Sequence, residues 1–158
     1  GVTKVKKKAE LLPAMEKAFR ESDEVMIEAF MKGKEVACGV VKVKSKTLIL
    51  PVTEIISKNE FFDYEAKYTP GKSEEVTPAN IPSMWTEEIQ QLRSKVYDLL
   101  GCRGIVRVDF IIVGDRPNFL EINTIPGMTE ESLVPKQARA AGIAVEELYA
   151  MVIEDLFK

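Results

Sequence analysis

The most consequential absence in this sequence is histidine, which does not occur among its 158 residues. Without imidazole the chain offers no Ser–His–Asp triad, no histidine-ligated zinc site and no imidazole proton shuttle. Its two cysteines, Cys38 and Cys102, match no zinc-binding or redox spacing, which favours reduced thiols in a cytosolic protein. Any chemistry must therefore come from carboxylates, Lys, Arg, Tyr, Ser, backbone groups and bound metal.

Long apolar runs and an excess of positive charge are also lacking. No segment approaches the length of a membrane span, and no secretory signal is present. The net charge of −3 offers no polycationic surface, so we expect neither nucleic acid nor membrane as a partner. Hydrophobic residues make up 46% and charged residues 30% of the chain, which is typical of a globular protein with a real core.

The polar residues that carry most information lie in residues 107–123, whose pattern predicts two strands joined by a glycine- and proline-containing turn. Side chains alternate between the faces of a strand, so Arg107 and Asp109 share one face. A short turn places Asp109 opposite Glu121 and Arg107 opposite Asn123. The other face is apolar and is expected to join the core through Val106, Val108, Phe110, Ile112, Leu120 and Ile122.

Two interpretations of this hairpin are open. Alternation alone predicts a half-exposed hairpin whose polar face meets water. Carboxylates directly opposite each other repel unless a cation lies between them, and Mg²⁺ and Mn²⁺ prefer oxygen ligands and often bridge to phosphate. Asp109, Glu121 and Asn123 therefore form a candidate metal site.

The run that follows has an unusual composition for a plain loop. Pro126-Gly127 marks a turn where the backbone can approach a ligand. Thr129 is a candidate helix N-cap, and Pro135 suits the first position of a further helical segment. The pattern fits an ordinary capped helix, and it also fits an anion site built from backbone N–H groups.

Taken together, these motifs resemble one family. Arg-x-Asp at 107–109, Leu-Glu-x-Asn-Thr-x-Pro-Gly-Met-Thr at 120–129 and Ser-Leu-Val-Pro at 132–135 resemble the D-alanine–D-alanine ligases of the ATP-grasp superfamily. Residues 61–68 resemble the mobile loop over that family's active site, and residues 24–35 resemble its nucleotide-binding strand. The resemblance implies an α+β fold, the ATP-grasp C-terminal domain, with a mainly antiparallel sheet and packed helices.

The resemblance also implies a domain organisation. Residues 1–27 would be a remnant of the central ATP-grasp domain, residues 28–158 the C-terminal catalytic domain, and residues 57–83 the active-site lid loop. The family's first half, with its phosphate-binding lysines and Ser/Gly-rich loop, has no counterpart in this sequence. We expect a C-terminal fragment, inactive alone, whose partner is that N-terminal half. The parent enzyme is expected to be a cytoplasmic homodimer.

The activity implied is ATP-dependent joining of two D-alanines through a D-alanyl phosphate, for peptidoglycan precursor synthesis. The cofactors would be ATP and two Mg²⁺ or Mn²⁺ ions, with Asp109, Glu121 and Asn123 as metal ligands. The catalytic residues would be Arg107, Gly127, Lys67 and Tyr68. Ser132 and Leu133 would bind the carboxylate of the second D-alanine. The nucleotide would be bound by Glu28, Ala29, Met31, Glu35 and Phe61.

Two positions bear on these roles, one that differs from the family and one that indicates the product. The family often has lysine where this chain has Ala29, a difference that matters little if only the backbone acts. Tyr68 follows Ala-Lys, as in enzymes that form the dipeptide rather than the depsipeptide. Two alternatives stay open: another ATP-grasp carboxylate–amine ligase that shares Arg107 and the metal ligands, and an isolated nucleotide- or metal-binding fragment.

The remaining elements are predicted from periodicity. Helices are expected at 6–20, 86–100, 135–141 and 145–157, a strand at 25–30, and a hairpin from 35–42 and 47–52, with 54–56 as an expected continuation of the sheet. Thr86 is the expected cap of the second helix and Gly101 its end. Its expected buried side consists of Ile89, Leu92, Val96, Leu99 and Leu100.

Overall fold

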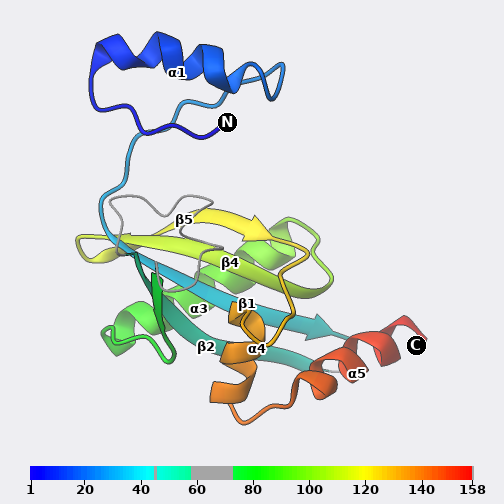
Figure 1. Ribbon diagram of the computed structural model, residues 1–158. Coiled ribbons are helices and arrows are strands. Elements are labelled where there is room, and N and C mark those ends of the chain that lie inside the picture. Colours follow the sequence, from blue (N-terminus) through cyan, green and yellow to red (C-terminus); the bar gives the residue numbers. More distant parts are fainter. Residues whose placement is uncertain (45, 58–72, 158) are drawn as a thin grey trace. The chain divides into compact units, whose positions relative to one another are not determined.

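The computed structural model describes residues 1–44, 46–57 and 73–157 (Figure 1). By their internal contacts these residues form two compact units. One holds Gly1–Met31 with the chain at Ser57 and Ser73, and the other holds Lys32–Ile56 and the residues from Glu74 onward. The predicted domain boundary after residue 27 stays a prediction. Most of the predicted lid at 57–83 lies outside the described residues.

The first unit contains one short helix, within the predicted range 6–20. A 3-10 turn, η1 (Lys8–Glu10), leads into α1 (Leu11–Ala18). The carboxylate of Glu10 accepts hydrogen bonds from the backbone N–H groups of Lys6 and Lys7, at 2.9 and 3.2 Å, which satisfies donors that a helix start leaves unpaired.

The prediction of a strand at 25–30 is wrong. That segment has no regular secondary structure, although its Val, Ile and Phe residues have high β propensity. This propensity takes effect only where a neighbouring strand supplies the ladder, and no strand in the described part of the chain pairs with this segment.

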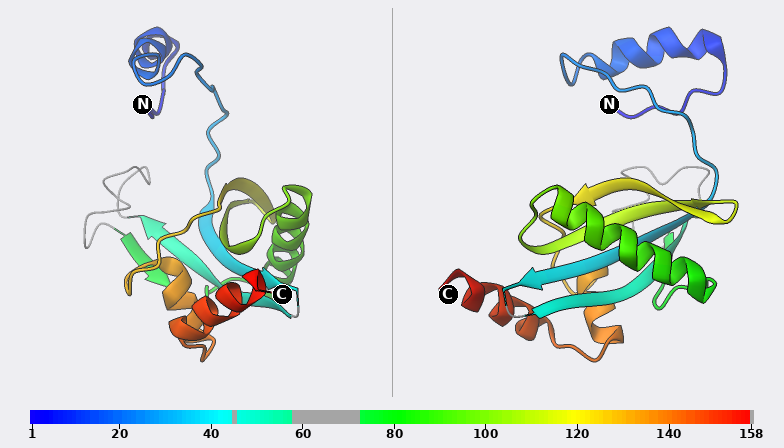
Figure 2. Two further views of the ribbon diagram at one scale, coloured as in Figure 1. Left: turned by 90° about the vertical axis from the view of Figure 1, so that its right-hand side faces the viewer. Right: turned by 180° about the vertical axis from the view of Figure 1, so that it is seen from behind.

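The second unit is built on a five-stranded sheet in the order β3-β2-β1-β4-β5. Its strands are β1 (Lys34–Val43), β2 (Lys46–Ser57), β3 (Ser73–Val76), β4 (Gly104–Val113) and β5 (Arg116–Asn123). The β1–β2, β1–β4 and β4–β5 pairs are antiparallel. Helix α3 (Ser83–Leu99) covers one face, and α4 (Leu133–Ala140) and α5 (Val145–Leu156) lie on the other (Figures 1 and 2). The predicted α+β architecture is confirmed.

Two apolar clusters follow from strand alternation. Toward α3, buried residues of β1 and β4 pack with Ile89 and Tyr97, and they include the predicted Val106, Val108, Phe110 and Ile112. Toward α4 and α5, Val41 and Leu50 pack with Val134, Ala138 and Leu148. The prediction for Leu120 is wrong, because its side chain is 40% exposed. A register shift between Asp109 and Phe110 leaves Leu120 as the extra residue of a bulge, outside the alternation.

Helix α3 differs from its prediction at its start and in its buried face. It begins at Ser83 after Pro82, so Thr86 lies inside the helix and is not its cap. Its buried positions recur every four residues, at Ile89, Arg93 and Tyr97. Leu99, about 200° around the helix from Tyr97, is 85% exposed, and Leu100, beyond the helix end, is 56% exposed. The predicted end is confirmed, since Gly101 has a φ of 60°.

The other predicted elements are confirmed with shifted boundaries. The first hairpin forms from β1 and β2, and β2 runs on through the predicted 54–56. Helix α4 begins two residues before Pro135, and α5 begins at the predicted Val145. Within the three described ranges, no helix has both the length and the apolarity needed to cross a membrane.

Candidate functional site

The β4–β5 hairpin has the register that its sequence predicts. Asp109 lies opposite Glu121, and Arg107 lies opposite Asn123. The neighbours of Arg107 and Asp109 on β4, Val106, Val108 and Phe110, face the α3 cluster. Strand alternation therefore puts Arg107 and Asp109 on the other face, the one that α4 covers in part.

Arg107 and Asp109 form a two-pronged ion pair. Arg107 Nε donates to Asp109 Oδ1 at 2.8 Å and Nη2 donates to Oδ2 at 2.7 Å. The two side chains are only 16% and 11% exposed, so water screens the pair weakly. The guanidinium fixes the direction in which the Asp109 carboxylate points.

The candidate metal ligands fit a hard divalent cation by their chemistry. Asp109 and Glu121 supply carboxylate oxygens from directly paired strand positions, and Asn123 supplies an amide oxygen that accepts from the Ile125 N–H at 3.1 Å. Among the described residues no group of three His, Cys, Asp or Glu side chains is placed to hold a metal. The candidate set holds only two residues of these types, Asp109 and Glu121, and its third ligand is the amide of Asn123. That observation therefore neither supports nor contradicts the set, and its assignment stays a prediction.

The segment after Asn123 closes on itself before α4. A Cβ added to Gly127 would lie 2.8 Å from Ser132 Oγ, so glycine permits this close approach. The hydroxyls of Ser132 and Thr129 are 2.8 Å apart, and the Ser132 N–H donates to the Thr129 carbonyl at 2.9 Å. Thr129 is not the N-cap that we predicted. It opens the preceding turn, and Ser132 occupies the N-cap position of α4. Gly127, Ser132 and Leu133 are thus brought together.

The predicted nucleotide-binding residues fall in different places. Glu28, Ala29 and Met31 belong to the first unit. Glu35 lies on β1, paired with Ile55 of β2 on one side and Ile111 of β4 on the other. Their convergence on a nucleotide stays a prediction. The predicted residues Phe61, Lys67 and Tyr68 lie outside the described residues.

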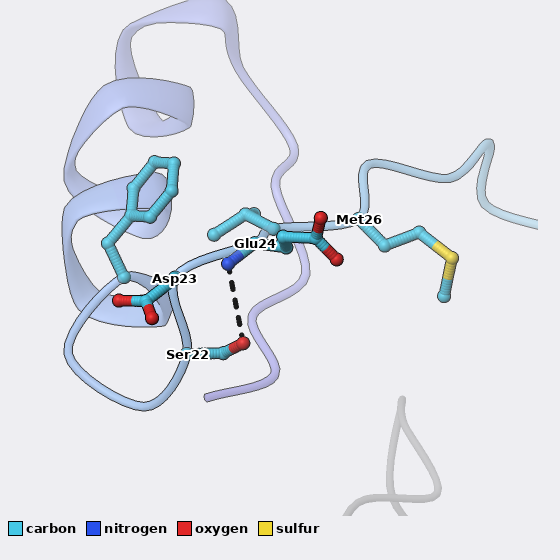
Figure 3. Close-up of a pocket in the computed structure, with 6 residues that line it drawn as sticks. Ser22, Asp23, Glu24 and Met26 are labelled. Atoms are coloured by element: carbon cyan, nitrogen blue, oxygen red, sulfur yellow. Dashed lines mark hydrogen bonds between the residues drawn. The ribbon is translucent and has the colours of Figure 1, made fainter.

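The first unit also has a shallow hollow, lined by Phe19 and by residues 22–26 (Figure 3). Within this lining the Glu24 N–H donates to Ser22 Oγ at 3.3 Å. Asp23 and Glu24 give this lining two carboxylates, which do not suit the phosphates of a nucleotide. We therefore assign no ligand to it.

Sequence reasoning missed two buried polar residues that contact the central strand. Arg93 of α3 and Gln137 of α4 are both 0% exposed and both hydrogen-bond to β1. Burial lowers the pKa of the Arg93 guanidinium, with contact to the Cys38 thiol opposing that effect. The sequence did hold a signal for their burial. Each polar residue lies three or four positions from apolar residues of its helix, Arg93 from Ile89 and Gln137 from Val134, and therefore falls on the apolar face.

Comparison with known proteins settles the family. Residues 1–154 match the family described as D-ala D-ala ligase C-terminus. The chain belongs to this family. The D-alanine–D-alanine ligase of Phocaeicola vulgatus is 54% identical over 158 residues, an alignment that covers 99% of this chain and 48% of that protein. The chain therefore spans about half the length of the curated relatives it matches.

Solved structures of ligases share the fold. The D-alanine–D-alanine ligase from Bacillus anthracis complexed with ATP superposes with a TM-score of 0.81 at 37% identity, over 98% of this chain and 50% of that one. The VanG D-Ala:D-Ser ligase from Enterococcus faecalis gives a TM-score of 0.82 at 34% identity, over 94% and 43%. The fold of this chain is that of the C-terminal part of an ATP-grasp ligase.

Proposed function

We propose that this chain is the C-terminal half of an ATP-dependent ligase that joins two D-alanines through a D-alanyl phosphate, for peptidoglycan precursor synthesis. The observation that carries the proposal is the β4–β5 register, which gathers Arg107, Asp109, Glu121 and Asn123 on one face. Membership of the D-alanine–D-alanine ligase C-terminus family supports the choice of reaction.

The chemistry explains why such residues are needed. A carboxylate ion resists attack by an amine, so the first D-alanine must be activated by phosphorylation. Phosphoryl transfer requires positioning and charge neutralisation more than covalent catalysis. Asp109, Glu121 and Asn123 would hold two Mg²⁺ or Mn²⁺ ions, which neutralise phosphate charge when bound. The ion pair with Arg107 orients the Asp109 carboxylate for that role.

In the second step the amine of the second D-alanine would attack the carbonyl carbon of the acyl phosphate, so that a C–N bond forms, the C–O bond to phosphate breaks and inorganic phosphate leaves. Arg107 would stabilise the negative charge of the tetrahedral intermediate, and the Gly127 N–H would donate to its oxyanion. Ser132 and the backbone of Leu133, at the start of α4, would bind the carboxylate of the second D-alanine. Lys67 of the lid would reach the transferred phosphate.

The nucleotide would be held by Glu28, Glu35 and Phe61 and by the backbones of Ala29 and Met31. We further propose that the complete enzyme is a cytoplasmic homodimer and that turnover requires a first half like that of its longer relatives. The chain alone would then bind ligands without catalysis.

A second candidate is a ligase of the same chemistry with a different acceptor. The similarity to a D-Ala:D-Ser ligase at 34% identity favours this as the alternative. The sequence around Tyr68 favours the D-alanine dipeptide, and the comparison of acceptors below distinguishes the two.

The test is an assay of ADP release with this chain joined to the first half of the Phocaeicola vulgatus ligase, which is itself the positive control. We expect turnover with D-alanine alone, and loss of turnover in Glu121→Gln but not in Asp115→Asn, a control in the exposed β4–β5 turn. Turnover that requires D-serine or D-lactate would support the second candidate. Turnover unchanged in Glu121→Gln would contradict the site assignment, and inactivity with every acceptor would contradict the ligase proposal.

A further inference from the structure

The centre of the sheet contains an irregularity beside the candidate site. On β1 and β2, Cys38 pairs with Val52 but Val40 pairs with Ile49, so two residues of β2, Leu50 and Pro51, lie opposite Gly39. Pro51 has no N–H to donate, so the regular ladder is interrupted at this point.

On its other edge β1 pairs without interruption with the strand that carries the candidate catalytic residues. Gly39 is the partner of Arg107, and Ala37 is the partner of Asp109. The stretch of β1 that lies opposite the irregularity in β2 is therefore also the segment that pairs with Arg107 and Asp109.

The side chain of Gln137 fills the interruption. Its Oε1 accepts from the Gly39 N–H at 2.8 Å, and its Nε2 donates to the Ala37 carbonyl at 3.0 Å and to Thr53 Oγ1 at 2.9 Å. A Cβ on Gly39 would come within 2.8 Å of the same Oε1, so glycine leaves the space that the amide occupies. Gln137 is fully buried, and its three hydrogen bonds use both amide protons and the carbonyl oxygen.

Arg93 of α3 binds the same part of the bulge from the opposite face of the sheet. Its Nη1 donates to the carbonyls of Gly39 and Leu50, at 3.1 and 3.0 Å. The bulge is thus bound from α3 on one side and from α4 on the other, and Gly39 is bonded to both helices.

Gln137 is also close in the helix to the residues proposed to bind the second substrate. Ser132 is the N-cap of α4 and Leu133 its first residue, and the first turn is closed by the Lys136 N–H on the Ser132 carbonyl at 3.1 Å. The neighbours Val134 and Ala138 are buried among apolar residues. Apolar contacts alone would allow α4 to shift relative to β1, because they have no preferred direction. The three hydrogen bonds of Gln137 are directional and therefore specify one position of α4 against β1.

We propose that Gln137 is a positioning residue that sets the start of α4, with Ser132 and Leu133, relative to Arg107 and Asp109. The inference rests on the proposed function, because it assigns Ser132 and Leu133 to the acceptor carboxylate and Arg107 to the tetrahedral intermediate. If α4 shifts, the acceptor amine moves relative to the group that stabilises its attack. A displacement of about 1 Å can reduce a rate by about a hundredfold.

The test uses the joined enzyme described above and compares Gln137→Met with wild type. Methionine keeps the length of the side chain and removes all three hydrogen bonds. We expect the KM for the second D-alanine to rise by about tenfold or more and kcat to fall, with the KM for ATP changed by less than about twofold. The matched control is Leu148→Ala, a fully buried residue of α5 in the same apolar cluster. It should lower Tm and leave both KM values unchanged.

A second variant decides the question if Gln137→Met does not fold. Thr53→Val removes one of the three bonds, and it should raise the KM for the second D-alanine in the same direction by a smaller factor. Equal changes in all KM values, or an unchanged KM for the second D-alanine, would overturn the inference. Absence of D-alanine turnover in the wild-type joined enzyme would instead count against the proposed function, so the two failures are distinguishable.

Discussion

At the scale of single residues, Arg107 serves Asp109 as an internal counter-ion. Both oxygens of the Asp109 carboxylate accept from one guanidinium. A divalent cation at this carboxylate must share it with Arg107 or displace it. The same positive charge that would steady an anionic intermediate therefore opposes metal binding when no substrate is present.

This competition gives a prediction for metal affinity. Arg107→Met should bind Mn²⁺ at least about fivefold more tightly than wild type, because removing the guanidinium from this weakly screened site removes at least about 1 kcal/mol of repulsion between two cations. Asp109→Asn should bind it more weakly. Free Mn²⁺ can be measured by electron paramagnetic resonance, with Arg103→Met, an exposed arginine just before β4, as the control. Weaker binding in Arg107→Met would show that the arginine supports the metal site rather than opposing it.

The buried thiol of Cys38 gives a prediction for pH. Burial raises its pKa from 9.0 to about 11, although the neighbouring Arg93 lowers it in part. The folded state therefore holds a proton that the unfolded chain releases above pH 9.0, and the free energy of unfolding should fall as pH rises from 9.0 to about 11. The total loss should be about 2–3 kcal/mol.

The measurement is urea unfolding of wild type and Cys38→Ala at a series of pH values. Tyr97 and Lys136 also have raised pKa values, so only the difference between the two proteins reports on Cys38. The difference in free energy of unfolding between wild type and Cys38→Ala should shrink as pH rises from 9.0 to about 11. A difference that stays constant from pH 8 to pH 11 would contradict the assignment.

At the scale of elements, α4 is bound to the sheet by charge as well as by Gln137. Lys136 pairs with Glu75 of β3 at 3.0 Å and with Glu131 at 2.9 Å. Burial lowers the pKa of this ammonium group, but hydrogen bonds and charge from the two carboxylates outweigh it, and the net pKa is raised. Glu75 is the third residue of β3, so the pair joins α4 to an edge strand of the sheet.

Lys136→Met should lower the free energy of unfolding by about 1 kcal/mol, the upper range for a partly exposed ion pair. Lys95→Met, at an exposed position of α3, should change it by less than about 0.5 kcal/mol. Urea titrations in low and high salt measure both. The cost of Lys136→Met should diminish in about 1 M NaCl, where the Debye length is about 3 Å. A cost independent of salt would indicate lost packing instead.

The elements also show what sequence could and could not reveal. The register of β4 and β5 was predictable because alternation and a short turn together leave one pairing that buries the apolar face. Leu120 was mispredicted because no local pattern marks the bulge that takes it out of alternation. Residues 25–30 were mispredicted because β propensity does not supply a partner strand.

The candidate site was predictable in part for the same reasons. Asp109, Glu121 and Asn123 are placed by the hairpin, and Gly127 and Ser132 by the turn before α4. The burial of Gln137 was indicated by its place on an apolar helix face, but its role was not predictable, since that role depends on a gap between β1 and β2 that lies far from it in sequence. Pro51 inside a strand was the one local sign of that gap, because proline is tolerated in strands chiefly at edges and bulges.

At the scale of the whole molecule, the two units differ in how much they bury. The sheet unit holds the buried residues of both apolar clusters. In the first unit, α1 has no buried residue, and large hydrophobic side chains are exposed at Leu12, Phe19 and Met26, by 64%, 51% and 78%. Phe19 and Met26 line the same hollow, and exposed apolar side chains that lie together commonly mark an interface. Relatives about twice the length of this chain have a further half that can cover it.

We therefore predict that the first unit is protected from proteolysis only when that further half is present. In this chain alone, trypsin should cut rapidly at Lys17 and Arg20, because cleavage follows local opening and α1 has no buried residue to oppose it. In the joined enzyme both sites should be cut at least about tenfold more slowly, as about 1.4 kcal/mol of added local stability would produce. Leu12→Lys should abolish this protection, whereas Glu16→Gln, which leaves the apolar side chains in place and adds no trypsin site, should retain it. Equal cleavage rates in the chain and the joined enzyme would mean that the exposed apolar residues of α1 do not contact the first half.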